Sequence, residues 1–298
     1  MEAALSSAAI AVMFMLILGL LLAAILAIAS RRLFVYEDPR IDEVEEMLPH
    51  ANCGACGTAG CRAFAEQLVA GEQQPGKCTV NSVDMNQQIA SFLGVDLGQQ
   101  EKRVARLACA GGSNVAHTHA SYSGLDTCHA AALVSGGGKS CVWGCLGFGD
   151  CGQVCDFDAI SMDRQRLPVV EADRCTACGD CVDICPRDLF SLQPVSHHLW
   201  VACNNPEAGD AAEADCRVLC NGCGRCVADA PEGMITLQDK LAVIDYSRNA
   251  LASRLAIERC PTGAIVWLDD GNAAHKGKAA VRIVRKTALP VGGDSTRV

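Results

Sequence analysis

Closely spaced cysteines are the residues of this sequence with the most evident chemistry. The chain has 20 of them among 298 residues, and sixteen fall into spacings that bind cubane iron–sulfur clusters. The clearest run is C-x2-C-x2-C-x3-C followed by Pro186. Such a run gives three thiolates to one cluster and, in two-cluster ferredoxins, its fourth cysteine to the neighbouring cluster. The pattern predicts electron transfer. The cluster ligands of this run are Cys175, Cys178, Cys181 and Cys185.

A second run, C-x3-C-x5-C-x3-C, precedes the first one. By the same exchange of ligands, its last cysteine, Cys155, is expected to complete the cluster of the first three cysteines of the later run. Cys185 is expected to complete the cluster of the other three. Eight cysteines would then hold two clusters, and those of the earlier run are Cys141, Cys145, Cys151 and Cys155.

The third cysteine region has lost one whole cluster. Its C-x2-C-x2-C run is intact, but Ala230 stands before Pro231 where a fourth cysteine would be expected. Counting back from the Cys260-Pro261 pair places alanine or serine at all three remaining ligand positions of the second cluster, 250, 253 and 256. One complete ligand set is therefore predicted, consisting of Cys220, Cys223, Cys226 and Cys260.

A further four-cysteine module precedes these runs, with C-x2-C-x4-C-x16-C spacing and glycines between the ligands. The glycines allow the backbone to wrap closely around a cluster. The segment from Arg62 to Gly71 predicts a short amphipathic helix that returns the chain to the last ligand. Four thiolates at this spacing are also compatible with one zinc ion. The ligands are Cys53, Cys56, Cys61 and Cys78, which brings the predicted total to four [4Fe-4S] clusters.

Four cysteines have no partner in these spacings. Because a free cysteine behaves as a small hydrophobic residue, we expect them to be buried structural thiols. A redox-linked pair or an unusual further cluster is the alternative. These residues are Cys109, Cys128, Cys203 and Cys216.

Residues 3–30 carry no charge and are the segment that we expect to anchor these modules in a membrane. It exceeds the roughly 20 residues of a membrane-spanning helix. A cleaved signal peptide is the alternative, but its basic leader is missing and the apolar stretch is too long. Arg31 and Arg32 follow directly, so the positive-inside rule places the body in the cytoplasm. The sequence predicts a single-pass protein of the bacterial inner membrane. Its cysteine-rich body would lie in the cytoplasm, where thiols stay reduced.

The formal net charge of −9 is unevenly distributed. Residues 271–298 contain six Lys and Arg against Asp294, whereas the rest of the chain is acidic. An acidic body argues against nucleic-acid binding, since phosphate contacts need clustered cations. The basic segment is expected to be a solvated end, with docking to anionic membrane lipid or to an acidic electron carrier as the alternative.

These features predict an α+β protein with an N-terminal transmembrane helix, a small four-cysteine Fe-S domain and ferredoxin-like polyferredoxin modules. The short strands and hairpins expected around the runs support the ferredoxin pattern. The expected boundaries are 1–32 for the anchor, 33–100 for the N-terminal 4Fe-4S domain, 101–200 for the two-cluster ferredoxin-like region, 201–270 for the degenerate one-cluster region and 271–298 for the basic tail.

With these residues in view, the chain resembles the B subunits of the Rnf (also called Rsx) electron transport complexes over nearly its whole length. The resemblance rests on LPHANCGACGTAGC at 48–61, LACAGG at 107–112, GGGKSCVWGCLGFGDCGQVCDFDAI at 136–160, CTACGDCVDICP at 175–186 and AVIDY at 242–246. His50 stands where the family usually has glycine, and the lost cluster leaves open whether the terminal unit conducts electrons or only supports the others.

The resemblance implies a subunit of an ion-translocating ferredoxin:NAD+ oxidoreductase. This chain would carry electrons between a soluble ferredoxin or flavodoxin and the other membrane and cytoplasmic subunits of the complex. NAD, flavin and Na+ or H+ sites would lie on those subunits. Two other hypotheses are electron donation to a different reductase or redox regulator without ion pumping, and a zinc-stabilised membrane scaffold.

Overall fold

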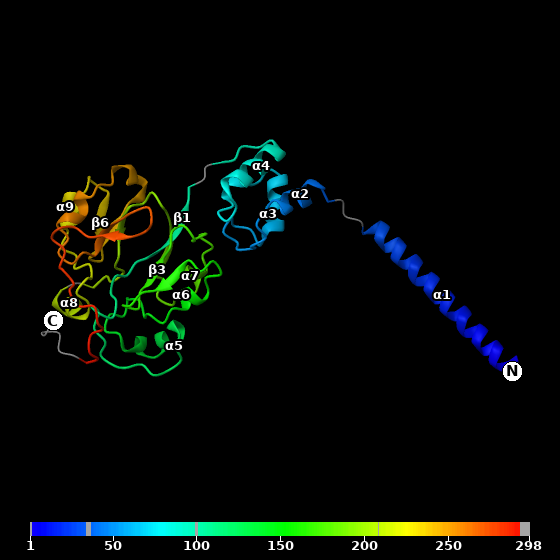
Figure 1. Cartoon of the computed structure of the whole chain (residues 1–298), viewed down its shortest axis with the longest axis horizontal. Helices are drawn as coiled ribbons and strands as arrows, with labels where there is room; N and C mark the ends of the chain where they lie inside the picture. Colours follow the sequence, from blue (N-terminus) through cyan, green and yellow to red (C-terminus); the bar gives the residue numbers. More distant parts are fainter. Residues whose placement is uncertain (1, 34–36, 99–100, 208, 293–298) are drawn as a thin grey trace.

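The computed structural model describes residues 2–33, 37–98, 101–207 and 209–292. Its first element is helix α1 (Glu2–Arg32). From Val12 to Arg32 this helix is long and apolar enough to cross a membrane, and its large apolar side chains there are exposed. Figure 1 shows α1 standing apart from the folded body. An isolated apolar helix satisfies its own backbone hydrogen bonds and needs lipid around its side chains.

A small helical module follows, made of α2 (Arg40–Glu46), α3 (Cys61–Val69), the 3-10 helix η1 (Pro75–Lys77) and α4 (Val83–Leu93). The helix predicted after Cys61 is confirmed. In the acidic stretch before it, Val44 and Leu48 are buried in the module core beside Phe64. The acidic residues lie on the outer side of α2, which makes it an amphipathic helix.

The ferredoxin region contains two antiparallel strand pairs, β1 with β4 and β2 with β3. Leu107 lies opposite Phe190 in the first pair, and Ile160 lies opposite Val170 in the second. Both pairs contribute to one apolar core with cysteines inside it. The elements are β1 (Arg103–Leu107), α5 (Cys128–Leu133), the 3-10 helix η2 (Ser135–Gly138), α6 (Asp150–Gln153), β2 (Ile160–Met162), β3 (Pro168–Val170), α7 (Asp180–Asp183) and β4 (Phe190–Pro194).

The terminal region repeats this plan, with β6 paired to β7 and β8 paired to both β5 and β9. Strand β5 pairs with β8 of this region, and it lies across the predicted boundary between residues 200 and 201. Ala256 and Ile257, at the position of the lost cluster motif, are buried in the apolar core. The elements are β5 (Leu199–Val201), α8 (Asp210–Asp215), α9 (Arg225–Asp229), β6 (Ile235–Gln238), β7 (Leu241–Ile244), the 3-10 helix η3 (Tyr246–Leu251), α10 (Leu255–Glu258), β8 (Ile265–Leu268) and β9 (Ala274–His275).

Most described residues of the basic C-terminal segment are exposed, as expected for a solvated end, but the segment also packs against the body at a few points. Leu289 is buried, and its amide donates a 2.8 Å hydrogen bond to the carbonyl of Ser113. The amide of Gly292 donates to the carbonyl of Thr118 at 2.8 Å. Charge alone missed these contacts because they use backbone groups and one apolar side chain. Residues 293–298 of the predicted tail lie outside the described residues.

A buried arginine joins the ferredoxin region to the terminal region. Arg106 is 2% exposed, and its guanidinium donates to the carbonyls of His197 and, at 3.1 Å, Val195. The ring of His197 stacks on Tyr246 with centroids 4.1 Å apart. The hydroxyl of Tyr246 in turn donates to the carbonyl of Leu199 at 3.0 Å. This chain of contacts fixes β1 against the start of the terminal region.

Replacing Arg106 with Met is expected to lower the thermal midpoint of the full-length chain by about 4–8 °C, as followed by circular dichroism. Two partly buried carbonyls would lose their donors, which costs on the order of 2 kcal/mol. Arg103→Met is the matched control, because this exposed neighbour also donates to a carbonyl, that of Leu192, and is expected to shift the midpoint by less than about 2 °C. Equal shifts in the two variants would contradict the assigned role of Arg106.

Candidate metal centres

All twenty cysteines lie in five groups of four, each drawn from segments that are partly distant in sequence. Four of the groups line cavities of their own, and three members of the fifth pack in the core of the helical module. Among the described residues, no three His, Cys, Asp or Glu side chains converge closely enough to hold a single ion. The thiols of each group are thus spread around a space and not drawn to one point.

The N-terminal group lies at the base of the helical module. Burial raises the pKa of Cys78, and the thiols of Cys56 and Cys53 lie near enough to add to the shift, while the amides of Asn81 and Val80 donate toward its sulfur. The group consists of Cys53, Cys56, Cys61 and Cys78, as the spacing predicted.

Two local features hold the loop of the N-terminal group in place. The amide of Cys61 donates to the side-chain oxygen of Asn52 at 2.8 Å. A side chain at Gly60 would meet that same oxygen at 2.8 Å. Gly54 adopts a positive φ of 71°, a conformation that glycine takes without strain. The glycine spacing seen in the sequence therefore serves the loop that presents three of the four thiols.

The first ferredoxin group follows the ligand exchange that the sequence predicted. Burial raises the pKa of Cys181 to about 12, and the neighbouring thiols of the group contribute to the shift. The amide of Ala105, from β1, donates to the sulfur of Cys175 at 3.4 Å. The cavity is lined by Cys155, Cys175, Cys178 and Cys181.

The second ferredoxin group differs from the prediction at one member, because Cys128 takes the place expected for Cys141. The carboxylate of Asp150 accepts hydrogen bonds from the amides of Cys128, at 2.8 Å, and His129, at 3.3 Å. This contact fixes the start of α5 directly beside Cys151. The cavity is lined by Cys128, Cys145, Cys151 and Cys185.

Electrostatics agrees with this grouping. Burial raises the pKa of Cys151 to about 12, and the thiols of Cys128 and Cys185 are the next contributions. Cys128 carries no spacing signal because it enters from a separate helix. The sequence signal near Cys128 was Thr127, which marks the start of α5 because its side chain accepts a hydrogen bond from the amide of Ala130.

The structure brings together the four cysteines of the terminal group. Burial raises the pKa of Cys226 to about 11, and the other three thiols of the group add to the shift. Cys223 is exposed at the surface. The cavity is lined by Cys220, Cys223, Cys226 and Cys260.

Cys141 lies in a fifth group, here called the central group, with three of the cysteines that had no partner in the spacing. Cys141 is 8% exposed and Cys216 is 5% exposed. The expectation of separate structural thiols does not describe this arrangement, because the four residues face a shared cavity. That cavity is lined by Cys109, Cys141, Cys203 and Cys216.

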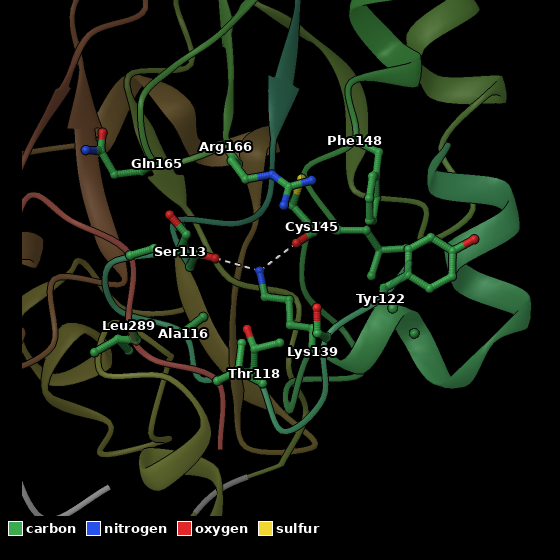
Figure 2. A pocket seen from close by; sticks show the side chains of 18 of the residues that line it. Ser113, Ala116, Thr118, Tyr122, Lys139, Cys145, Phe148, Gln165, Arg166 and Leu289 are labelled. Carbon is green, nitrogen blue, oxygen red and sulfur yellow. Dashed lines mark hydrogen bonds between the residues drawn. The ribbon is translucent and has the colours of Figure 1, made fainter. Parts of the chain in front are cut away.

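Lys139 lies between the central group and the second ferredoxin group. Its ammonium donates to the carbonyl of Gly111 at 2.6 Å and to that of Cys145 at 2.5 Å, and Figure 2 shows it reaching into a pocket beside Cys145. The pocket has a volume of about 290 Å³. Burial raises the pKa of Cys145 to about 12, and Lys139 opposes the shift. A cation is thus fixed beside both sets of sulfur ligands.

The residues present fit iron–sulfur clusters. Thiolates are the ligands of such clusters, and amides directed at sulfur stabilise the negative charge that bound clusters carry. Each group supplies four thiols, and backbone amides point at ligand sulfurs in the N-terminal and both ferredoxin groups. The buried thiols pack within the apolar cores.

Comparisons with known proteins agree with this arrangement. The family model FeS, for an Fe-S cluster domain, matches residues 48–80, and the model Fer4, for a 4Fe-4S binding domain, matches residues 168–190. These matches confirm the predicted combination of an N-terminal Fe-S domain with a ferredoxin-type domain in a fold of mixed helices and strands. The fold and the grouped cysteines define an iron–sulfur electron-transfer protein of the polyferredoxin class.

Relatives that cover most of the chain identify the family. The chain is 36% identical to the B subunit of the Na+-translocating ferredoxin:NAD+ oxidoreductase complex of Acetobacterium woodii, over 84% of this chain and 74% of the relative. It is 37% identical to the proton-translocating counterpart of Clostridium ljungdahlii, over 86% and 91%. It is 36% identical to the B subunit of the ion-translocating oxidoreductase complex of Methanosarcina acetivorans, over 83% and 94%. The chain belongs to the family of B subunits of Rnf-type ion-translocating oxidoreductase complexes.

Proposed function

We propose that this subunit carries electrons, one at a time, between a soluble low-potential ferredoxin or flavodoxin and the other subunits of a complex that exchanges them with NAD and couples the transfer to Na+ or H+ movement. The names of the relatives support the reaction. The cysteine groups support the role of this chain, for which we assign one [4Fe-4S] cluster to each of the N-terminal, first ferredoxin, second ferredoxin and terminal groups.

The observation that carries this proposal is the contact between successive groups. The hydroxyl of Thr79, next to Cys78, donates to the carbonyl of Thr176, next to Cys175. The N-terminal group is thereby joined to the first ferredoxin group. Both ferredoxin groups contribute cysteines to one core, in which the thiols of Cys181 and Cys151 lie near each other. Neighbouring groups in contact are what an electron relay requires.

The protein's own residues hold and tune these sites without making or breaking bonds of a substrate. A bound [4Fe-4S] cluster supplies a one-electron couple, so that one electron gained from a donor is matched by one electron passed on. The cysteine thiolates would hold the cluster, and burial would exclude water from it. Amides such as those of Ala105 and Asn81 stabilise negative charge at the sulfurs, and this sets the potential.

The membrane assignment follows from α1 and its flanking charges. Arg31 and Arg32 lie in its last turn, and basic residues next to a membrane span favour the cytoplasmic side. We therefore place the body in the cytoplasm, where a soluble carrier reaches it, with α1 in the inner membrane beside the other subunits. The N-terminal group lies closest to α1 along the chain.

Iron and acid-labile sulfide analysis of the full-length chain, purified anaerobically in detergent, tests the proposal. We expect at least about sixteen iron atoms per chain, interacting S = 1/2 signals in EPR spectra after dithionite reduction, and bleaching of visible absorption by reduced ferredoxin. One zinc per group with no EPR signal would overturn the electron-transfer function. Iron at this level without any reduction by ferredoxin or flavodoxin would overturn the proposed carrier.

Cys181→Ser is expected to lower the iron content by about four atoms per chain, because this residue belongs to one group only. Ser191→Ala, at a half-buried position of β4, is the control and should leave the iron content unchanged. An unchanged count in the Cys181 variant would contradict the assignment of the first ferredoxin group.

A further inference from the structure

The central group is the part of the molecule that the four-cluster proposal does not use. Its members enter from four separate segments. Cys109 follows β1, and Cys203 follows β5. Cys216 directly follows α8, and Cys141 lies between η2 and α6. Four isolated structural thiols would have no reason to line one cavity, yet these residues do.

The sulfur atoms of the group are close together. A side chain at Gly111 would meet the sulfur of Cys216 at 3.1 Å and that of Cys109 at 3.6 Å, so both sulfurs flank the same backbone position. The thiol of Cys109 also lies near enough to Cys141 and Cys203 to raise the pKa of each, after the larger effect of burial. Cys109 is therefore a neighbour of all three other members.

Donors surround this cavity as they surround the other cysteine groups. The amides of Gly111 and Cys145 each donate to the sulfur of Cys109 at 3.4 Å. The side-chain amide of Asn205, which is 2% exposed, is directed at the sulfur of Cys141 at 4.0 Å. Lys139 adds a cation at the rim. Donors and positive charge directed at sulfur stabilise thiolates that bind a metal cluster.

We propose that Cys109, Cys141, Cys203 and Cys216 bind a fifth [4Fe-4S] cluster. The proposal extends the proposed function, on which it rests for the identity of the cofactor. It gives a ligand role to every cysteine in the chain.

The position of the site explains what a fifth cluster would do. On one side, the amide of Cys145, a member of the second ferredoxin group, donates directly to Cys109. On the other side, Cys203 packs against the apolar core that contains Cys226 and Cys260 of the terminal group. The central site thus lies between the ferredoxin pair and the terminal unit. With it, the terminal unit is a conducting part of the relay and not only a support.

The iron and sulfide content of the wild-type chain gives the first test and needs no variant. We expect about twenty iron atoms per chain, four more than the other groups hold. A wild-type content of about sixteen would overturn the fifth cluster and leave the proposed function standing. A chain with little or no iron would instead overturn the proposed function itself. Zinc is measured on the same sample, and one zinc in place of four iron atoms would also overturn the fifth cluster.

The second test is the double variant Cys203→Ser with Cys216→Ser, made in the full-length chain. We expect it to contain about four iron atoms fewer than wild type, and to lose the magnetic interaction between the terminal cluster and its neighbour in EPR spectra. Cys223→Ser in the terminal group is the control, since it also removes about four iron atoms but leaves the central site intact. Unchanged iron in the double variant would overturn the proposal.

Discussion

Removal of iron from the full-length chain, by an oxidant and a chelator under anaerobic conditions, is expected to abolish cooperative thermal unfolding of the ferredoxin and terminal regions. The helices here have as few as four residues and the strands as few as two, too short to be stable alone. The apolar cores that hold these helices and strands together contain cysteines. Structural metals contribute on the order of 10 kcal/mol to such small domains. Loss of the clusters should therefore leave the ferredoxin and terminal regions without a stable packed state.

The two parts of the body should respond differently. The helical module has an apolar core of its own, in which Phe64, Leu68 and Ile89 are almost fully buried. We expect helical circular dichroism from this module and from α1 to persist, while the strand pairs lose hydrogen-exchange protection. A cooperative transition near the midpoint of the iron-loaded chain after complete extraction would contradict this expectation.

Lys139→Met is expected to lower the midpoint potentials of the clusters in the second ferredoxin and central groups by roughly 100 mV. A Cβ atom added at Gly144 would lie 3.5 Å from the Lys139 nitrogen and 3.5 Å from the Cys141 sulfur. These two atoms are therefore within about 7 Å of each other. At that separation a unit charge changes the energy of an added electron by about 2.4 kcal/mol at an effective dielectric constant near 20. Removing the cation disfavours the reduced, more negative state.

EPR-monitored redox titration measures this shift. Lys102→Met is the matched control, because Lys102 is half exposed and is near a carboxylate of Asp173 instead of the thiols. Its removal should change no potential by more than about 20 mV, given screening by solvent. Unchanged potentials in the Lys139 variant with clusters retained would show that this cation does not set them.

Much of this architecture could be predicted from local patterns. Uninterrupted apolarity predicted α1, and regular spacing predicted the N-terminal group, the first ferredoxin group and the terminal group. These features are local in sequence or follow the known exchange between adjacent runs. The loss of one cluster in the terminal region was also evident, because every ligand position of that cluster had changed together. Ala256, at one of those positions, and its neighbour Ile257 are buried in the apolar core of this region.

The remaining groups could not be predicted because their members come from loops outside the runs. Cys141 has the spacing of a ferredoxin ligand, but Asp150 draws Cys128 into that position by binding the start of α5. Cys141 then meets Cys203 and Cys216 across more than sixty residues of sequence. No periodic pattern encodes such a contact. The remaining signal for a further site was the number of cysteines without partners in the spacings, which is four, the same as the number of ligands of one cluster.

The scattered origin of the ligands has a consequence for biogenesis. As the chain leaves the ribosome, the N-terminal group is complete once Cys78 has emerged, and the two ferredoxin groups are complete at Cys181 and Cys185. The central group waits for Cys216, although its first member precedes both ferredoxin groups. We therefore expect cofactor loading to proceed in a fixed order, with Cys109 held open until the terminal region arrives.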